Sequence, residues 1–365
     1  MSRAATALIN LAALQANLQT VRRCCPAARI LAVIKANAYG HGMVRVAQAL
    51  YQADAFGVAS IDEALCLRAA GIRHPLVLLE GFFEAAELPL IAREHLSVVI
   101  HDQRQLRVLE GARLEAPLRV WLKIDSGMHR LGFPPDEVTA AYQRLRCCSQ
   151  VTGIHLMSHL ACADERGNDE TVRQMRVFNA VVEHLEGPRS MANSAGILYW
   201  PETHGHWVRP GIMLYGASPC SDRVGVDDGL QPVMSLQSAL IAVRHCRRGE
   251  AVGYGGSWRC PDDMPLGIVA MGYGDGYPRT ISSAAKVLIN GQRVPIVGRV
   301  SMDMLTVDLR SCPTARCGDP VILWGAGLPV EEVASWAGTI AYELLCAVSS
   351  RVCFSEQRNE SSSWQ

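Results

Sequence analysis

The chain has 365 residues, of which 49% are hydrophobic and 19% charged, so it can bury a large core and is not a disordered protein. Its 35 basic and 35 acidic side chains balance to a net charge of zero, which excludes a chain-wide attraction to nucleic acid or to an anionic membrane. Its apolar runs are too short to span a bilayer and its start does not resemble a secretory leader, so we expect a cytoplasmic protein that binds a small molecule.

Eight short apolar runs alternate with amphipathic segments from the start of the chain to about residue 225. The runs cover 30–35, 56–60, 76–81, 97–100, 119–125, 151–158, 189–193 and 206–210. The segments between them, such as 61–70 and 169–186, carry apolar residues three and four apart, as helices do. This alternation predicts an α/β fold, with a (β/α)8 barrel of the TIM type over residues 1–225.

Polar residues and a glycine lie where these runs end. They are Lys35, Lys123, Asp125, His159, Asn193, Ser194, Arg209 and Gly211. Because the active site of such a barrel lies at the carboxyl ends of its strands, these residues are the first candidates for function. Lys35 is the most informative of them, since a buried lysine of lowered pKa can form a Schiff base with an aldehyde cofactor. A strand-end lysine whose amine reaches water is the alternative, and the stretch alone leaves both open.

Shorter alternating runs follow from about residue 226. They cover 234–244, 266–271, 286–289, 293–297, 304–308 and 320–324, and they predict a mainly β domain over 226–365. Asn290-Gly291 between two of them predicts a type I′ hairpin turn, and the polar end at 356–365 is expected to fray. Thirteen cysteines without Cys-x-x-Cys spacing are interpreted as reduced thiols, and we expect no metal site.

A series of motifs in this order resembles the bacterial alanine racemases, which are barrel-type enzymes dependent on pyridoxal 5'-phosphate (PLP). The series starts with Val-Ile-Lys-Ala-Asn-Ala-Tyr-Gly-His-Gly at 33–42. It continues at 123–132, 158–159, 193–195, 209–212, 253–255, 272–276, 298–303 and 341–343. The resemblance covers nearly the whole chain and implies the interconversion of L- and D-alanine by a homodimer with shared active sites.

The resemblance also implies residue roles. Lys35 would hold the cofactor aldehyde and serve as base on one face of the substrate, with Tyr254 from the partner subunit on the other. Tyrosine has an ordinary pKa near ~10, so Tyr254 would need nearby cations, and the family suggests His159 and Arg209. Tyr39, Ser194, Gly211, Ile212 and Tyr342 would hold the phosphate, and His159, Asn193 and Arg209 would complete the cofactor site.

Arg209 would determine which reaction occurs. Arginine keeps its proton, so beside the pyridine nitrogen it donates a hydrogen bond without protonating the ring, which the family uses to favour reprotonation over transamination. Alone, an arginine after a strand indicates a surface position, and only the surrounding 208–212 motif favours the cofactor role.

Further positions concern the substrate. In relatives a lysine matching Lys123 carries a carbamate that orients Arg130 toward the substrate carboxylate, with a backbone N–H from Met302. An ion pair between Lys123 and Asp125 is the alternative. Tyr254 and Tyr342 would narrow the entry, which favours alanine and makes serine a weak substrate. Four residues would lie farther out along the entry, namely Tyr273, Arg279, Arg299 and Asp164.

Four other functions compete with this one. A serine or broad-specificity racemase would share the fold, and Leu160 and Ser301 depart from the common family residues. A barrel-type decarboxylase would place an acid where this chain has Arg209, and a PLP-binding homeostasis protein would lack the β domain. A metal-dependent hydrolase could use His155 and His159, but the first run lacks the His-x-His and the last lacks the Asp that such a site needs. Supply of D-alanine for peptidoglycan and alanine catabolism both remain open.

Overall fold

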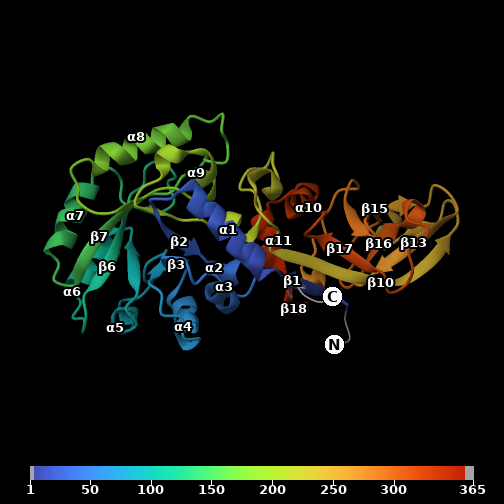
Figure 1. Ribbon diagram of the computed structural model, residues 1–365, viewed down its shortest axis with the longest axis horizontal. Coiled ribbons are helices and arrows are strands. Elements are labelled where there is room, and N and C mark those ends of the chain that lie inside the picture. The colour runs from blue at the N-terminus through green and yellow to red at the C-terminus, as the bar shows by residue number, and fades with distance from the viewer. Residues whose placement is uncertain (1–3, 358–365) are drawn as a thin grey trace, which may run out of the picture. The chain divides into compact units, whose positions relative to one another are not determined.

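The computed structural model describes residues 4–357, and the chain divides into two compact units (Figure 1). The barrel unit comprises Asn17–Leu214, and the β unit comprises the N-terminal residues up to Ala16 together with the chain from Tyr215 onward. The boundary therefore differs from the one expected at 225. The N-terminal residues belong to the β unit because strand β1 (Thr6–Ile9) pairs with strands β10 (Met234–Cys246) and β18 (Cys353–Glu356).

The barrel unit is built on eight parallel strands that close into a ring, as the sequence predicts. They are β2 (Arg29–Val33), β3 (Ala55–Val58), β4 (Leu76–Leu78), β5 (Ser97–Ile100), β6 (Leu118–Lys123), β7 (Val151–Met157), β8 (Arg189–Ser190) and β9 (Trp207–Val208). The ring closes where Arg29 and Ile30 of β2 pair with Trp207 and Val208 of β9. Every barrel strand coincides with one of the eight apolar runs, so the predicted fold class is confirmed.

One helix leads into β2, and the others connect the barrel strands in chain order. The helices are α1 (Leu11–Cys24), α2 (Lys35–Tyr39), α3 (Met43–Ala49), α4 (Ile61–Ala69), α5 (Leu88–Arg93), α6 (Gln103–Gly111), α7 (Val138–Cys147), α8 (Glu170–Val182) and α9 (Ser194–Tyr199). Short 3-10 helices are η1 (Ala85–Glu87), η2 (Pro201–Thr203) and η3 (Ile212–Tyr215), the last of which starts in the barrel unit.

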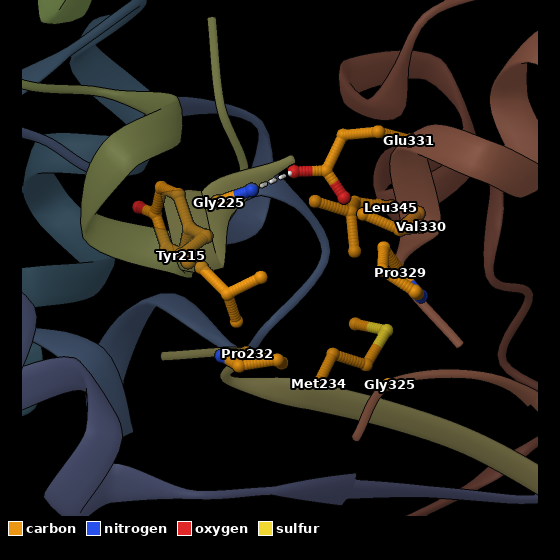
Figure 2. A pocket seen from close by; sticks show the side chains of 11 residues that line it. Tyr215, Gly225, Pro232, Met234, Gly325, Pro329, Val330, Glu331 and Leu345 are labelled. Carbon is orange, nitrogen blue, oxygen red and sulfur yellow. Dashed lines mark hydrogen bonds between the residues drawn. The ribbon is translucent and has the colours of Figure 1, made fainter. Parts of the chain in front are cut away.

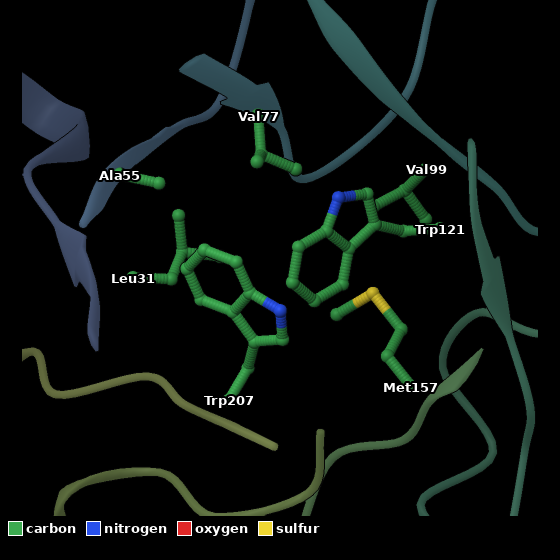
Figure 3. Close-up of a cluster of buried hydrophobic side chains, with 7 residues drawn as sticks. All are labelled: Leu31, Ala55, Val77, Val99, Trp121, Met157 and Trp207. Carbon is green, nitrogen blue, oxygen red and sulfur yellow. The ribbon is translucent and has the colours of Figure 1, made fainter. Parts of the chain in front are cut away.

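The barrel interior is filled by side chains from the strands (Figure 3). The cluster consists of Leu31, Ala55, Val77, Val99, Trp121, Met157 and Trp207, all less than 10% exposed. The Trp121 and Trp207 rings meet edge to face, with centroids 5.6 Å apart. Because this layer leaves no passage through the barrel, a ligand must bind at an end of the strands.

The β unit contains an eight-stranded sheet in the order β13-β16-β15-β14-β17-β10-β1-β18. The strands not yet bounded are β13 (Met264–Val269), β14 (Lys286–Ile289), β15 (Gln292–Val297), β16 (Leu305–Asp308) and β17 (Pro320–Trp324). Asn290 and Gly291 have φ values of 48° and 76°, which confirms the predicted turn between β14 and β15.

Shorter elements complete the β unit. Strands β11 (Ala251–Val252) and β12 (Trp258–Arg259) form a separate hairpin. The helices are η4 (Gly225–Asp228), η5 (Tyr254–Gly256), η6 (Tyr273–Asp275), η7 (Leu309–Ser311), α10 (Val330–Ala337) and α11 (Ala341–Ala347). None of the helices within residues 4–357 is long and apolar enough to cross a membrane. The expectation of a frayed end from residue 356 is wrong at Glu356, which pairs with Ile9 as the last residue of strand β18, and the chain from 358 onward lies outside the described residues.

Candidate active site

Lys35 begins a left-handed turn directly after strand β2. The four residues that follow it, from Ala36 to Tyr39, have φ values between 51° and 56° although none is glycine. Residues with a Cβ atom each lose roughly 1–2 kcal/mol in this conformation, so other contacts must hold the turn. The sequence predicts a turn here from its glycines, but it does not predict four left-handed residues in a row.

The contacts that hold this turn come from Glu63, in the first turn of helix α4. Its carboxylate accepts hydrogen bonds from the backbone N–H of Ala36 at 2.8 Å and of Ala59 at 2.7 Å. At the other end of the turn the Asn37 side chain accepts a bond from the N–H of Met43 at 2.9 Å. Glu63 therefore fixes the backbone on which Lys35 and Tyr39 stand, and sequence analysis missed it because an acid at a helix start is common.

Several cations gather at the carboxyl ends of the barrel strands. The charges of Arg209, Arg130 and Lys35 all act on Lys123, which is 8% exposed, and burial together with these charges lowers its pKa to about 8. Glu80 is a carboxylate within this group, with an oxygen 4.0 Å from the Lys35 amine. Four cations around one carboxylate leave an excess of positive charge, which suits an anionic ligand.

Arg209 is buried, with 4% of its surface exposed. Its guanidinium donates to the Ser190 hydroxyl at 2.6 Å, to the carbonyl oxygens of Met191 at 3.2 Å and of Ser158, and it lies 3.3 Å from the His159 ring. Burial lowers the pKa of Arg209 to about 10, so it keeps its proton at neutral pH. A surface position for this arginine is therefore excluded.

His159 lies beside Arg209 as a neutral ring. Loss of hydration, followed by the charges of Arg209 and Lys123, holds its pKa well below the ordinary value. The Nδ1 atom can then accept from the Arg209 guanidinium, which fixes both side chains at the end of the barrel.

Ser194, Gly211 and Tyr39 meet at a second point of the same strand ends. The Ser194 hydroxyl accepts from the N–H groups of Gly211 at 3.0 Å and Met213 at 3.4 Å, and Asn193 caps helix α9. A Cβ atom placed on Gly211 would lie 2.5 Å from the Tyr39 hydroxyl oxygen. Ile212, the next residue after Gly211, is buried. Hydroxyl groups and N–H groups that converge around a glycine fit a phosphate, so these residues fit the expected cofactor.

Two alternatives to this site involve Asp125, as an ion-pair partner of Lys123, and His155, as a metal ligand. In the structure both residues make different contacts. The Asp125 carboxylate accepts from the N–H groups of Gly127 and His129, each at 3.0 Å, and contacts the His129 ring at 3.0 Å. The His155 ring packs edge to face on Trp121 in the barrel interior, with centroids 4.4 Å apart. Within residues 4–357 no group of three or more His, Cys, Asp or Glu side chains could hold a metal ion.

The remaining sequence candidates lie in the β unit, except for Asp164, which is exposed in the barrel unit. Tyr254, Met302 and Tyr273 are 67%, 52% and 40% exposed. Arg299 and Arg279 are exposed and Tyr342 is half-buried. The exposed side chains of Tyr254, Met302 and Tyr273 can therefore meet a substrate or another copy of the chain.

Two glycine-containing turns carry these β-unit candidates. Tyr254 stands between Gly253 and Gly255, both with φ above 70°, and a Cβ atom on Gly255 would lie 3.0 Å from the Arg299 guanidinium. In the second turn the N–H of Tyr273 donates to Ser301 at 3.0 Å and that of Gly274 donates to Met302 at 2.9 Å. Arg299 thus lies against the glycines that flank Tyr254, and the turn that carries Tyr273 is joined by backbone hydrogen bonds to Ser301 and Met302.

Arg351 supports the second turn and was not predicted. Its guanidinium contacts the buried Asp275 at 3.6 Å and forms an ion pair with Asp303, next to Met302. The Asp275 carboxylate also accepts from the N–H of Gly272 at 3.0 Å.

Two family models match the chain. The alanine racemase N-terminal domain matches residues 9–219, and the alanine racemase C-terminal domain matches residues 233–355. A protein of Escherichia coli O6:H1 named "Alanine racemase, biosynthetic" is 54% identical over 351 residues, which are 96% of this chain and 98% of that protein.

Solved structures agree with these matches. The biosynthetic alanine racemase from Pseudomonas aeruginosa has a TM-score of 0.95 and 46% identity, covering 98% of this chain and all of that one. The alanine racemase from Acinetobacter baumannii has a TM-score of 0.92 and 40% identity, covering 97% of this chain and all of that one. Both domains of the family thus match this chain, and the chain belongs to the alanine racemase family of isomerases.

Proposed function

We propose that this protein is an alanine racemase that interconverts L- and D-alanine with PLP at the carboxyl ends of the barrel strands. The observation that carries the proposal is the buried Arg209 beside the neutral His159, among cations that include Lys35. A decarboxylase would need an acid where Arg209 lies. Since relatives at 54% identity are named biosynthetic, we propose supply of D-alanine for peptidoglycan in the cytoplasm.

The residues at the strand ends suit the three parts of the cofactor. PLP, when bound, supplies an electron-withdrawing ring that makes the α-proton of an amino acid removable. Lys35 would hold its aldehyde, and the hydroxyls of Tyr39 and Ser194, which meet beside Gly211, would hold its phosphate. Asn193, Ile212 and Tyr342 would complete the phosphate site. Arg209, fixed by Ser190 and His159, would donate to the ring nitrogen and keep its own proton.

Racemisation needs proton transfer on both faces of the substrate, and Lys35 and Tyr254 would carry these two transfers. The amine of Lys35 would remove or return the proton on one face, and the Tyr254 hydroxyl would do so on the other. Tyr254 is 67% exposed, which suits insertion into the active site of a partner subunit in a homodimer. The dimer would then be required for activity.

Arg130 would bind the substrate carboxylate, assisted by the N–H of Met302. Lys123 has a pKa of about 8, so a sizeable fraction of its amine is neutral near pH 7–8 and can add to CO₂. The carbamate that results, with release of one proton, would offset the excess positive charge and orient Arg130.

The entry to the site would determine which amino acids are accepted. Tyr254 and Tyr342 would form its inner part, and Tyr273, Arg279, Arg299 and Asp164 its outer part. Phenol rings near the substrate exclude side chains much larger than methyl but reject an added hydroxyl poorly, so serine would react slowly.

The test is a time course of enantiomer composition with the PLP-loaded protein and L-alanine or L-serine. We expect L-alanine to reach equal L and D quickly, and L-serine to do so slowly. Lys35→Ala should abolish both, whereas Lys286→Ala, which removes a lysine from strand β14, should behave as wild type.

Equal rates for the two substrates would replace the proposal by a broad-specificity racemase. Absence of D-alanine despite bound PLP would overturn racemisation altogether and favour a decarboxylase or a PLP carrier.

A further inference from the structure

We propose that Cys246 and Cys260 form a redox-active thiol pair, which a low-molecular-weight disulfide converts to an intramolecular disulfide that closes the segment carrying Tyr254. Both cysteines belong to the β unit, and all the contacts that support the pair lie within that unit.

The backbone brings the two cysteines to the same end of the β unit. Cys246 is the last residue of strand β10, and Cys260 directly follows strand β12. Between them the chain turns at Arg247, whose carbonyl accepts from the N–H of Glu250 at 3.1 Å. The backbone of Cys260 pairs with this turn: its N–H donates to the carbonyl oxygen of Glu250 at 2.9 Å, and its carbonyl oxygen accepts from the N–H of Gly249 at 2.8 Å.

The side chains share one apolar cluster. Cys260 is 2% exposed and packs with Val252, Met264, Leu266 and Val297, and the half-buried Cys246 and Trp258 pack against the same cluster. Cys246 pairs across the sheet with Met264 of that cluster. The Cys246 side chain also acts on the pKa of the Cys260 thiol, as a neighbour in this cluster does.

The environment assigns a different role to each thiol. Burial, followed by the neighbouring Cys246, raises the pKa of the Cys260 thiol above its ordinary value, which disfavours its thiolate and suits Cys260 to react second. Cys246 reaches solvent and is therefore the thiol that meets an oxidant first. A thiol that solvent can reach, next to a second thiol that can resolve a mixed disulfide, is the arrangement found in redox-sensing pairs.

The chemistry is thiol–disulfide exchange. The Cys246 thiolate attacks one sulfur of the small disulfide, which forms a mixed disulfide and releases one small thiolate. Cys260 then loses its proton to solvent and attacks the Cys246 sulfur, releasing the second small thiolate. Two protein thiols are oxidised and one small disulfide is reduced to two thiols.

The bond would close a segment of 15 residues, 246–260, with Tyr254 in its middle. Gly253, Gly255 and Gly256 all have positive φ, so the backbone beside Tyr254 lacks the restriction that side chains impose. A crosslink at its base restricts the positions that Tyr254 can reach. The effect on racemisation rests on the proposed role of Tyr254, whereas formation of the bond does not.

To test this proposal, the PLP-loaded protein is treated with oxidised glutathione, and the remaining thiols are blocked with an alkylating agent. The protein is then digested and its peptides are identified by mass spectrometry. We expect one dominant crosslink that joins Cys246 to Cys260 and lowers the mass by about 2 Da, the loss of two hydrogens. Cys246→Ser should abolish it. Cys317→Ser removes an exposed thiol that donates a hydrogen bond to the Ile241 carbonyl, and this variant should form the same crosslink as wild type.

A glutathione adduct on Cys246 without the crosslink would overturn the proposal, as would a different dominant pair. Because Cys246→Ser could disturb the cluster, hydrogen exchange of the oxidised wild type provides a second measurement. Amides in 247–259 should exchange more slowly after oxidation and return to the earlier rate with a reductant, and an unchanged rate would contradict closure of the segment.

Racemase activity separates the two proposals. We expect oxidation to lower it about tenfold, since small misplacements of a reacting group are costly, and a reductant to restore it. A crosslink with unchanged activity would overturn the control of Tyr254. A protein with no racemase activity before oxidation would overturn the proposed function, while the peptide map would still test the thiol pair.

Discussion

The barrel unit and the β unit present their candidate residues in opposite ways. In the barrel unit Arg209 and Lys123 are 4% and 8% exposed, and Arg209 is held by hydrogen bonds to Ser190 and to backbone carbonyls. In the β unit Tyr254 and Met302 are 67% and 52% exposed and stand on turns. Burial therefore controls charge in the barrel unit, whereas backbone conformation controls position in the β unit.

The left-handed turn after Lys35 is an exception to this difference between the two units. It lies in the barrel unit, yet it depends on backbone geometry imposed by Glu63. Changes at this turn should affect activity most, because they displace a reacting amine, while changes in the β unit away from its candidate residues should first affect stability.

Glu63→Ala should have the largest effect. The N–H groups of Ala36 and Ala59 lose their acceptor, so the left-handed residues relax and Lys35 shifts. We expect kcat to fall about 100-fold, the cost of a displacement near 1 Å. Asp62→Ala, an exposed acid in the same helical turn, is the matched control, and equal kcat values for the two variants would contradict the role of Glu63.

Gly211→Ala should weaken cofactor binding about tenfold, or roughly 1.4 kcal/mol. The added Cβ atom would lie 2.5 Å from the Tyr39 hydroxyl oxygen and would displace it from the phosphate site. A fluorescence titration of the apoprotein with PLP measures the change. Gly153→Ala in strand β7 is the control because nothing lies within 4 Å of its Cβ position, and wild-type PLP affinity in the Gly211 variant would argue against the site.

Glu331 provides the corresponding test in the β unit. Its carboxylate accepts from the N–H groups of Ser218 at 2.8 Å and Gly225 at 2.7 Å, beside a cavity of about 20 Å³, room for one water molecule (Figure 2). Glu331→Ala should lower the free energy of unfolding by about 1–3 kcal/mol, because it leaves these groups unpaired. Glu332→Gln, in the surface ion pair with Arg293, should change it by less than about 1 kcal/mol.

The pH dependence of Glu331→Gln sharpens this test. Burial raises the pKa of Glu331 above its ordinary value of 4.5, so the folded state favours the protonated form. The stability from this group is therefore complete below pH 4.5 and is lost as pH rises through the raised pKa. Since glutamine does not ionise, the variant should gain stability relative to wild type toward neutral pH. Urea unfolding curves that keep a constant difference across pH would show that Glu331 does not titrate this way.

The smallest expected effect is the pH dependence of carbamate formation at Lys123. With a pKa of about 8, the neutral fraction of its amine rises roughly fivefold between pH 7 and 8. Carbamate formation at fixed dissolved CO₂ should rise over the same interval, measured by ¹³C NMR with labelled CO₂. Lys123→Met should lose the signal, and a signal that does not change with pH would contradict the carbamate.

Local patterns in the sequence determined most of the fold. The eight apolar runs became the eight barrel strands because a buried parallel strand needs nearly continuous apolar residues wherever it pairs. Asn290-Gly291 determined its turn because both residues tolerate positive φ. Strands β11 and β12 were not predicted because neither lies in an apolar or alternating run, unlike the equally short β8 and β9.

The tertiary structure alone decided features that join distant residues. Glu63 accepts a hydrogen bond from the N–H of Ala36, 27 positions away in the sequence. The buried Arg209 is held by Ser190 and His159. Strand β1 lies in the β unit because its partners are β10 and β18. Periodicity reports which face of a segment is buried, but not which distant group covers it. The sequence by itself thus determined the strands and the candidate residues, and packing decided which backbone, charges and partners those residues acquire.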